Sequence, residues 1–405
     1  MNLLKHRFNK IINYIKYLSM GNCKRDPNIW IMGEWFGDRT GDNVTVFANY
    51  IAMHFPEINV YWVSNTPEEV RKEFNENIKI IDRKKDNSKL FKASAVAVMN
   101  QSYEDLSEQG TNFWKNAITL NLWHGVMWKK IGFDTYPKRK FIGKLYRDIR
   151  NSSFCSMLYE STSERYSKCI KTAFDITDNN IIKAGLPRNN IFYSKEQIEN
   201  SKEKILSLLG IQEANNIKII TYMPTFRDNN KSLFSFDMLA DNIDFMKYLD
   251  ENNIIIIQKT HYVSQQRNNG EKILVKSNRI FNLPNVRAQD LLAATDLLVT
   301  DYSSCFFDYL LLNRPIIHYM YDYDTYKDFD KGFYYDYKDV VAGDIAYNQD
   351  ELVNSIIANI ENPNKMQNIR NKRKNEFLTY ESPESCKIIS QAVFDKIKEN
   401  FEGRI

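Results

Sequence analysis

One histidine stands where a general base could act. His124 follows directly after the apolar run at residues 118–123, and Gly125 comes next. Glycine permits a sharp turn, so a strand over this run would present the imidazole at its carboxyl end. Lys129 and Lys130 follow soon after, and nearby positive charge lowers the pKa of an imidazole and keeps it neutral. The pattern suits general-base catalysis, although a buried histidine that merely ends a strand has the same pattern.

Cationic side chains follow two other apolar runs, where they could bind a diphosphate. Lys259 and His261 end the run IIIIQKTH, and Arg227 follows the run IITYM. A guanidinium can hold phosphate oxygens through two parallel hydrogen bonds, and an ammonium adds a compact positive charge. The alternatives are a polar loop start for Lys259 and His261 and a surface ion pair between Arg227 and Asp228.

The most informative segment lies around Asp301. Thr300 ends the apolar run LLVT, and Asp301 follows it directly. Ser303 and Ser304 then stand at the start of a helical stretch, where the free N–H groups of the backbone attract anions. Asp308 lies about one helical turn further on and is expected to face the same side. A strand, a serine turn and a helix could therefore hold a nucleotide diphosphate without a glycine-rich loop, but an ordinary capped helix has the same residues.

Several standard sites are absent from the sequence. It contains no G-x-G-x-x-G or G-x-x-x-x-G-K-[ST] nucleotide motif, no G-x-S-x-G turn and no H-E-x-x-H zinc motif. The five cysteines are far apart and form no C-x-x-C pair, which favours a reducing compartment. We therefore expect no tightly bound cofactor and no resident metal, while a diphosphate substrate leaves room for a Mg²⁺ ion.

Two sets of strands and helices must position these residues. Short apolar runs alternate with helical stretches in each half of the chain, which is typical of parallel sheets covered on both faces. In the first half the expected strands are 29–32, 60–63, 78–81, 95–99, 118–123 and 181–184, and the expected helices are 43–54, 67–75 and 161–174. In the second half the expected strands are 217–222, 254–258, 273–275 or one at 280, 297–300 and 316–319, and the expected helices are 236–250, 288–294, 304–312 and most of 349–401.

This alternation predicts two α/β domains, each built on a parallel sheet. It restarts after a charged stretch at residues 194–216, so we place the two domains at residues 21–195 and 196–405. The C-terminal helices are expected to pack back across both domains. Ligands of such folds bind at the carboxyl ends of the strands, so the expected site is a central cleft between the two domains.

The composition is that of a globular protein without a strong excess of charge. Hydrophobic residues make up 43% of the 405 residues, which excludes disorder as the main state. The formal net charge of only +4 argues against a tail-type nucleic-acid binder. The aromatic stretch at residues 321–339 alternates with acids rather than with cations, so base stacking explains it poorly. We expect no nucleic-acid partner.

The first 20 residues form a basic, amphipathic pattern. Phe8, Ile11, Ile15 and Leu18 recur at helical spacing, and the segment contains lysines and an arginine but no acid. Such a helix can lie in an anionic membrane surface; a terminal helix packed on its domain is the alternative. The chain has no apolar run long enough to cross a bilayer, and this segment lacks the features of a signal peptide. We therefore expect a cytosolic protein that docks on a membrane through residues 1–20.

Several short motifs, taken in order along residues 30–340, resemble those of one known family. They are Gly33-Glu34-Trp35-Phe36-Gly37 with Asp42-Asn43, Trp123-His124-Gly125 with Lys129-Lys130, Pro224-Thr225-Phe226-Arg227, Lys259-Thr260-His261, Thr300-Asp301-Tyr302-Ser303-Ser304 with Phe307-Asp308, and Tyr321-Asp322-Tyr323-Asp324 with Tyr326, Gly332-Phe333-Tyr334 and Asp336. On these residues the chain resembles the CDP-glycerol glycerophosphotransferases, which prime or extend teichoic acids and related capsular polymers. Its length is similar to that of the compact, primase-like members.

The resemblance implies a GT-B architecture, in which two Rossmann-like domains face a cleft, and attachment to the cytoplasmic face of the cell membrane as a peripheral protein. It also implies transfer of glycerol phosphate from CDP-glycerol to a hydroxyl of a lipid-linked saccharide or polyol-phosphate acceptor, with release of CMP. CDP-ribitol as the donor and a GT-B glycosyltransferase acting on a sugar nucleotide are the alternatives. A membrane-docked nucleotide-binding scaffold is the alternative without catalysis.

The same resemblance distributes roles over the two domains. The expected catalytic residues are His124, as the general base, and Asp301. The second domain is expected to hold the donor, with the diphosphate on the cations and the serine turn, and with polyol or ribose hydroxyls on Asp301 and Asp308. The expected substrate-binding residues are Lys129, Arg227, Lys259, His261, Thr300, Ser303, Ser304 and Asp308.

One segment departs from the family pattern. Many members have a polar, proline-containing stretch after the His-Gly pair, whereas this chain has Val126-Met127-Trp128. The departure bears on the acceptor rather than on the reaction. An apolar rim at this place would suit a lipid-linked or sugar-terminated acceptor.

Overall fold

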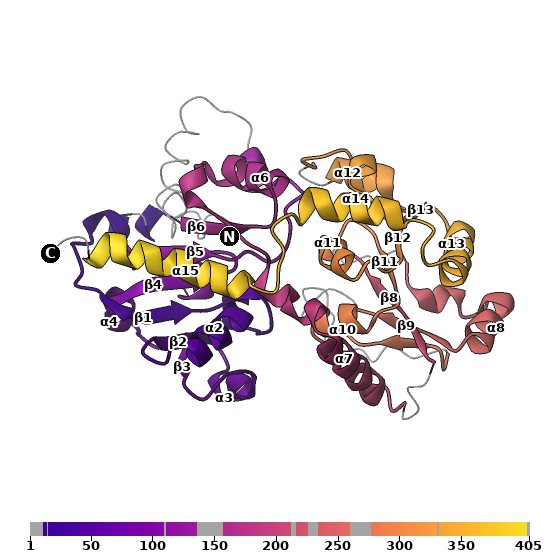
Figure 1. Cartoon of the computed structure of the whole chain (residues 1–405), viewed down its shortest axis with the longest axis horizontal. Coiled ribbons are helices and arrows are strands. Elements are labelled where there is room, and N and C mark those ends of the chain that lie inside the picture. Colours follow the sequence, from indigo (N-terminus) through magenta and orange to yellow (C-terminus); the bar gives the residue numbers. More distant parts are fainter. Residues whose placement is uncertain are drawn as a thin grey trace. The chain divides into compact units, whose positions relative to one another are not determined.

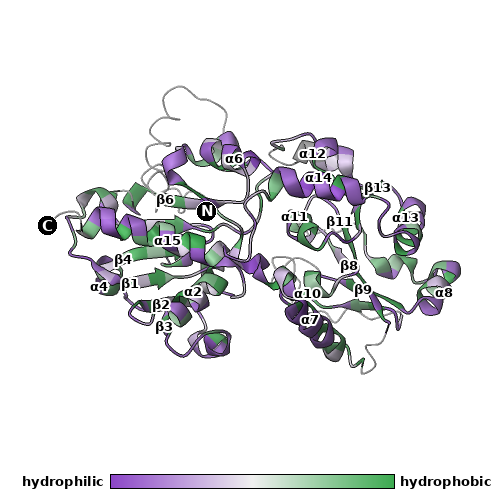
Figure 2. Ribbon diagram, viewed as in Figure 1, coloured by the Kyte–Doolittle hydropathy of each residue, from purple (hydrophilic) through white to green (hydrophobic). Residues whose placement is uncertain are grey.

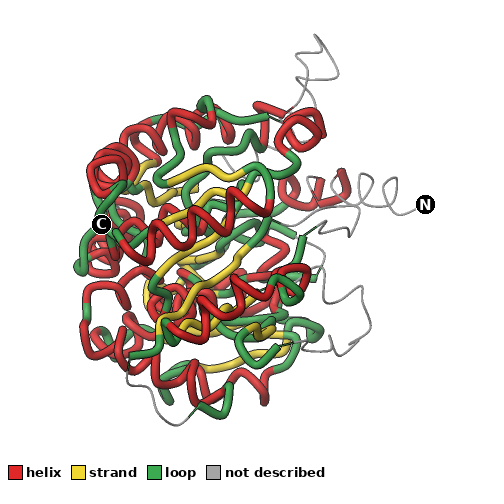
Figure 3. The backbone as a smooth tube through the Cα atoms, turned by 90° about the vertical axis from the view of Figure 1, so that its right-hand side faces the viewer, coloured by secondary structure: helices red, strands yellow, loops and turns green. Residues whose placement is uncertain are grey.

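The computed structural model describes residues 11–13, 15–108, 111–135, 157–211, 216–225, 234–259, 277–329 and 332–402. The chain divides into two compact units, which we call the first unit (residues 1–190 with 379–405) and the second unit (residues 191–378). In both, the strands pair in parallel and lie between layers of helices (Figure 3). The expected fold class, two α/β units built on parallel sheets, is confirmed.

The sheet of the first unit has seven strands among the described residues, in the order β3-β2-β1-β4-β5-β6-β7. Its central strand β4 is buried along its whole length, because helices and loops cover both faces of the sheet. The strands are β1 (Asp26–Met32), β2 (Asn59–Ser64), β3 (Lys79–Asp82), β4 (Ser94–Met99), β5 (Ile118–Asn121), β6 (Met157–Ser161) and β7 (Ile181–Lys183). The α-helices are α2 (Asn43–His54), α3 (Pro67–Val70), α4 (Ser88–Ala93), α6 (Glu164–Phe174) and α15 (Ser385–Ile397).

One apolar cluster joins α2 and α15 to the same face of this sheet. Phe47 of α2 and Val393 of α15 are fully buried in it together with Trp30 of β1. The ring of Trp30 lies 5.4 Å from that of Phe394 on α15. Figure 1 shows α15, in yellow, running along the sheet of the first unit. The last helix therefore contributes to the core of the unit that the N-terminal half of the chain builds.

The sheet of the second unit has six strands among the described residues, in the order β10-β9-β8-β11-β12-β13. The strands are β8 (Lys218–Met223), β9 (Ile254–Gln258), β10 (Ile280–Asn282), β11 (Leu297–Thr300), β12 (Ile316–Tyr319) and β13 (Asp344–Ala346). The α-helices are α7 (Lys195–Leu208), α8 (Ile243–Glu251), α10 (Ala288–Ala294), α11 (Cys305–Tyr309), α12 (Tyr323–Phe329), α13 (Gln349–Glu361) and α14 (Gln367–Phe377).

Two layers of helices cover the second sheet. Leu249 of α8 and Ile356 of α13 belong to one buried cluster with Ile220 and Val299 of the central strands. Helices α10 and α11 contact β8 and β11. Figure 2 shows the apolar residues, in green, on the strands and on the helix sides that face them, and the polar residues, in purple, on the outer sides. Strands β9, β8 and β11 are consecutive neighbours in this parallel sheet, so their carboxyl ends lie side by side at one edge.

The unit limits differ from the expected domains in one respect. The division falls at residues 190 and 191, close to the expected boundary, but residues 379–405 belong to the first unit and not to the second. The reason is the apolar face of α15, whose Ile389 and Val393 are buried in the first core. Of the C-terminal helices, α13 and α14 belong to the second unit and α15 belongs to the first.

Candidate active site

The turn after β5 places His124 at the carboxyl end of a strand. Asn121 ends β5, and its side-chain oxygen accepts a hydrogen bond from the backbone N–H of Trp123 at 2.9 Å. Trp123 has φ 43° and Gly125 has φ 136°. A positive φ is unusual for a large side chain and costs on the order of 1–3 kcal/mol, so the surrounding contacts must maintain this turn.

Two indole rings flank the imidazole of His124. The ring of Trp123 stacks on it with centroids 4.6 Å apart, and the ring of Trp35 lies 5.2 Å away on a tilted plane. Nδ1 of His124 lies 3.4 Å from the backbone carbonyl of Asn100. A carbonyl only accepts, so this contact favours the proton on Nδ1 and leaves the lone pair on Nε2. Nε2 is therefore the nitrogen that can take a proton from a substrate.

Burial lowers the pKa of His124 to about 4, against the opposing effect of the nearby Asp42 carboxylate. The positive charges of Arg188 and Arg39 lower it further. The imidazole is consequently neutral at pH 7, which is the state that a general base requires.

A buried ion pair lies beside this histidine. Asp42 and Arg188 are 3.0 Å apart, and each side chain is 9% exposed. Asp42 also accepts hydrogen bonds from the indole N–H of Trp35 at 2.8 Å and from the backbone N–H of Asn43 at 2.8 Å. Burial opposes ionisation of Asp42, but Arg188 and then His124 outweigh it and lower the pKa of the carboxyl. Asp42 thus fixes one of the two rings that enclose His124.

Glu34 secures the start of α2 next to this pair. Its fully buried carboxyl group accepts backbone hydrogen bonds from Asp42, Val44 and Thr45 and a further bond from the Thr45 hydroxyl. These donors are free N–H groups of a helix N-terminus. Burial and the charge of Asp42 raise the pKa of Glu34 to about 8. The segment Glu34-Trp35 and the helix start Asp42-Asn43 are therefore linked through one carboxyl.

The second unit gathers polar residues where β8, β9 and β11 end. Asp301, directly after β11, accepts hydrogen bonds through Oδ1 from the backbone N–H and the hydroxyl of Thr225, which follows β8, at 2.7 and 2.6 Å. The same oxygen accepts from the N–H of Tyr302 at 2.6 Å. Lys259, at the end of β9, donates its backbone N–H to Tyr222 and its Nζ to the carbonyl of Pro284 at 2.6 Å. Asp301 thus joins the ends of β8 and β11.

The predicted residues of this unit differ in their access to solvent. The predicted residues Lys259, Ser303 and Ser304 are partly exposed, and so is Thr225, which stood only within a family motif. Ser304 is the N-cap of α11 and makes no side-chain capping bond, and Ser303 Oγ lies 3.5 Å from the backbone nitrogen of Cys305. The partly exposed residues are the ones that a donor molecule can reach.

Three predicted residues of this unit are buried. They are Thr300, Asp301 and Asp308. Thr300 donates its hydroxyl to the carbonyl of Met223 at 2.7 Å, and Asp308 accepts from the side chain of Gln289 at 3.1 Å. These contacts favour a supporting role behind the exposed serine turn.

The structure describes only some of the remaining residues that were predicted from the sequence. Arg227 and His261 lie outside the described residues. Lys129 is partly exposed and follows the turn of His124. The expected apolar rim at Val126-Met127-Trp128 is wrong, because these side chains are only 2%, 4% and 1% exposed. They pack inside the first unit and present no apolar surface to an acceptor.

Sequence reasoning assigned no role to the residues that hold His124 in place. Glu34 and Asn43 stood only within a family motif, and Arg188 and Asn100 were not singled out. Arg188 follows the strand β7 in the polar sequence LPRNN, and an arginine after a strand end is the one signal that could have marked it. Glu34, Asn43 and Asn100 are distant from His124 in the sequence, and only the order of the strands brings them close to its turn.

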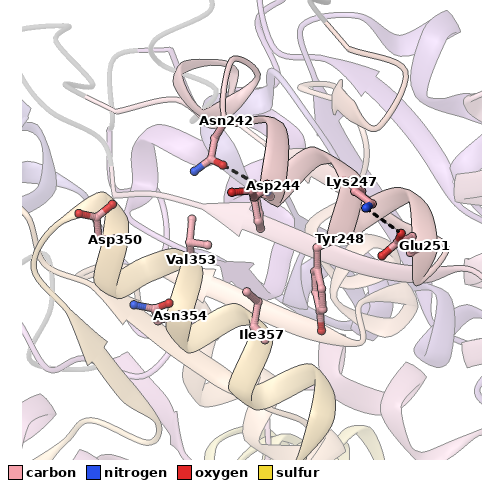
Figure 4. Close-up of a pocket in the computed structure, with 10 residues that line it drawn as sticks. Asn242, Asp244, Lys247, Tyr248, Glu251, Asp350, Val353, Asn354 and Ile357 are labelled. Carbon is pink, nitrogen blue, oxygen red and sulfur yellow. Dashed lines mark hydrogen bonds and ion pairs between the residues drawn. The ribbon is translucent and has the colours of Figure 1, made fainter.

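Neither a metal cluster nor a surface groove competes with the strand ends as the candidate site among the described residues. Within the described ranges no group of three or more His, Cys, Asp or Glu residues could hold a metal ion. A groove of about 700 Å³ runs between α8 and α13 (Figure 4), lined in part by Asp244, by the pair Lys247 and Glu251, and by Asp350. None of the residues predicted to do chemistry lines this groove.

Comparison with known proteins identifies the family. The profile described as CDP-glycerol:poly(glycerophosphate) glycerophosphotransferase matches residues 21–395. The chain belongs to this family. It is therefore a transferase, and the family resemblance read from the motifs is confirmed.

Two curated relatives of this glycerophosphotransferase family are informative. The teichoic acid glycerol-phosphate transferase of Staphylococcus aureus is 26% identical over 97% of this chain and 100% of its own. The teichoic acid glycerol-phosphate primase of Bacillus subtilis is 33% identical over 48% of this chain and 47% of its own.

Solved structures share the fold of this family member. The wall teichoic acid polymerase TagF, 20% identical, matches with a TM-score of 0.77 over 98% of both chains. A putative UDP-N-acetylglucosamine 2-epimerase from Listeria monocytogenes, 12% identical, matches with a TM-score of 0.54 over 93% of this chain and 98% of its own. At these identities the likeness shows the fold, and it confirms the expected GT-B class.

Proposed function

We propose that this chain transfers glycerol phosphate from CDP-glycerol to a hydroxyl group of a teichoic acid acceptor. The observation that carries the proposal is the neutral imidazole of His124, held at a strand end between two indole rings. Membership of the glycerophosphotransferase family supports the donor and the reaction. The teichoic acid relatives support the pathway.

The proposed reaction needs one proton acceptor and one site for the leaving group. The acceptor oxygen attacks the β-phosphorus of CDP-glycerol while its proton passes to Nε2 of His124. The bond between the β-phosphorus and the bridging oxygen breaks, and CMP leaves with that electron pair. Such phosphoryl transfers depend on positioning and charge stabilisation more than on covalent help from the protein. A resident metal is not part of the proposal.

The second unit is the proposed donor site. Ser303, Ser304 and Lys259 are partly exposed at neighbouring strand ends, and hydroxyl and ammonium donors suit a diphosphate. Arg227 and His261, outside the described residues, keep their proposed role as further diphosphate ligands. Asp301 supports this edge by holding Thr225 and the turn at Tyr302.

CDP-ribitol is the second candidate donor. A teichoic acid poly(ribitol-phosphate) polymerase of Bacillus spizizenii is 29% identical over 60% of this chain and 38% of its own. A release assay separates the candidates: the purified chain is mixed with CDP-glycerol, CDP-ribitol or a UDP-sugar and a lipid-linked disaccharide acceptor. We expect kcat/KM for CMP release from CDP-glycerol to exceed that from CDP-ribitol by about tenfold or more. Faster turnover of CDP-ribitol, or of a UDP-sugar, would overturn the proposed donor.

We also propose that the N-terminal segment binds the membrane surface. Described helical residues 11–13 and 15–19 present exposed apolar side chains, with Ile11 at 45%, Ile15 at 58% and Leu18 at 55% exposure. Polar contacts join the segment to the rest of the first unit: Thr111 donates to the side chain of Asn13. Lys115 similarly donates to backbone carbonyls of the segment. An apolar face turned outward supports docking on lipid. Within the described ranges no helix is both long and apolar enough to span a bilayer.

The double variant Ile15→Glu/Leu18→Glu tests this docking. Burial of one such side chain contributes roughly 1.5–3 kcal/mol, so co-sedimentation with phosphatidylglycerol vesicles should weaken at least about 100-fold. Release of CMP with a soluble acceptor analogue should remain unchanged. Ile243→Glu, at a site that is 80% exposed in the second unit, is the matched control and should bind vesicles normally. Equal vesicle binding by the double variant and the parent chain would contradict the docking role.

A further inference from the structure

The turn that carries His124 depends on contacts from outside its own strand. Trp123, directly before the histidine, has a backbone conformation that large side chains rarely adopt. Asn121 contacts the N–H of Trp123 from the strand side. That bond does not involve the carbonyl groups of Leu122, which is buried, and of Trp123, which is partly buried. Polar backbone groups shielded from water require partners, so another residue must bind these carbonyls.

Asn43 is the residue that binds both carbonyl groups. Its side-chain Nδ2 donates to the carbonyl of Leu122 at 3.0 Å and to the carbonyl of Trp123 at 3.0 Å. Its Oδ1 accepts the backbone N–H of Arg188 at 3.1 Å. Asn43 is fully buried, and both hydrogen atoms of its amide are used. One side chain therefore joins the turn of the imidazole to the backbone of Arg188.

The position of Asn43 is itself fixed. It is the first residue of α2, and the side chain of Asp42 caps the helix by accepting its N–H. Glu34 binds the next N–H groups of the same helix. The amide therefore projects from a rigid helix start and not from a loop, which is the arrangement that holds a reacting group most accurately.

We propose that Asn43 is a positioning residue for His124. It would act by fixing the two peptide groups that precede the histidine, and it contacts no substrate. The inference rests on the proposed function, because it requires His124 to be the proton acceptor. Asn43 would thus affect the reaction rate without contacting the reacting atoms.

The same helix supplies a matched control. Asn49 also has a fully engaged amide: Nδ2 donates to the carbonyls of Thr45 and Glu73, and Oδ1 accepts the N–H of Asn75 at 2.7 Å. None of these three hydrogen bonds is made to a residue of the turn that carries His124. Asn43 and Asn49 thus make the same number of hydrogen bonds from one helix, and only Asn43 contacts the turn.

The first test compares Asn43→Ala with Asn49→Ala. Both variants should lower the melting temperature, since each removes three hydrogen bonds, from a buried amide at Asn43 and from a partly buried amide at Asn49. Only Asn43→Ala should lower kcat for CMP release, by about 10- to 100-fold, because a small displacement of a reacting group is costly. Its KM for CDP-glycerol should stay within about twofold of the parent value. An equal loss of kcat in both variants would show a general structural effect and overturn the proposal.

A double-mutant cycle provides the second readout. In a His124→Ala background, Asn43→Ala should cause no further loss of the residual rate, because the residue acts only through the imidazole. Full additivity of the two losses would overturn the inference while leaving the proposed function intact. If His124→Ala alone retains full turnover, the proposed base itself is wrong. Should Asn43→Ala fail to fold, Asn121→Ala removes the bond to the N–H of Trp123, and the same outcomes apply to it.

Discussion

Replacement of His124 by alanine is expected to lower kcat for CMP release from CDP-glycerol at least about 100-fold. A general base contributes roughly 10²- to 10⁴-fold, and the structure offers the neutral imidazole that this role requires. Binding of CDP-glycerol should remain within about twofold, since the proposed donor residues lie in the second unit. Stopped assays of CMP release and equilibrium titration of the nucleotide measure the two quantities separately.

His54→Ala is the control for this experiment. His54 is an exposed histidine on α2, stacked on Tyr50 at 4.2 Å, and it has no contact with the turn of His124. Its replacement should leave kcat unchanged. Retention of more than about a tenth of parental kcat by folded His124→Ala would remove the general base from the mechanism.

Much of the fold could be predicted because its strands are continuous apolar runs. The strands Ile254–Gln258, Leu297–Thr300 and Ile316–Tyr319 have the predicted bounds. All are central or nearly central in a sheet that is covered on both faces, and their composition follows from that burial. Strand β6 was missed because its sequence MLYES ends in polar residues that join the following helix pattern. The edge strand β13, only three residues long, was missed because edge position relaxes the demand for apolar side chains.

The candidate site was predictable only in part, for a topological reason. His124 could be found locally, because a strand, a histidine and a glycine are consecutive. The residue that holds its turn could not, because Asn43 reaches Trp123 across 80 positions of sequence. An asparagine at a helix start has a sufficient local explanation as part of a cap. That the start of α2 lies next to the end of β5 can be recognised only when the strand order is known.

The same limit applies to the buried carboxyl groups. Asp301 was expected to be catalytic on the family resemblance, yet it is fully buried and accepts three hydrogen bonds through one oxygen. Its contacts to Thr225 and Tyr302 favour a positioning role, in which it fixes two strand ends beside the partly exposed serines. The sequence pattern of a positioning carboxylate and of a catalytic one is identical, because both follow the same strand.

Substitution of Asp301 distinguishes these roles and should have the largest effect on stability. Asp301→Ala leaves three donors without their acceptor; the N–H of Tyr302 is buried and the two donors of Thr225 are partly buried. A buried donor that is left unsatisfied costs about 1–3 kcal/mol. We expect a loss of about 3 kcal/mol or more in the free energy of unfolding and a melting temperature lower by about 10 °C. Thermal unfolding followed by calorimetry measures the change. Asp336→Ala, which removes an exposed capping carboxylate after β12, is the control and should cost about 1 kcal/mol or less.

Asp301→Asn then separates geometry from charge. The amide oxygen can accept the same bonds from Thr225 and Tyr302, although without the strength that a charged acceptor adds. If Asp301 acts by position, the folded asparagine variant should retain at least about a tenth of parental kcat. A loss of about 100-fold in a variant with a near-parental melting temperature would instead require the negative charge itself in the transition state. The outcome decides whether the carboxylate behind the serine turn shapes the donor site or takes part in the transfer.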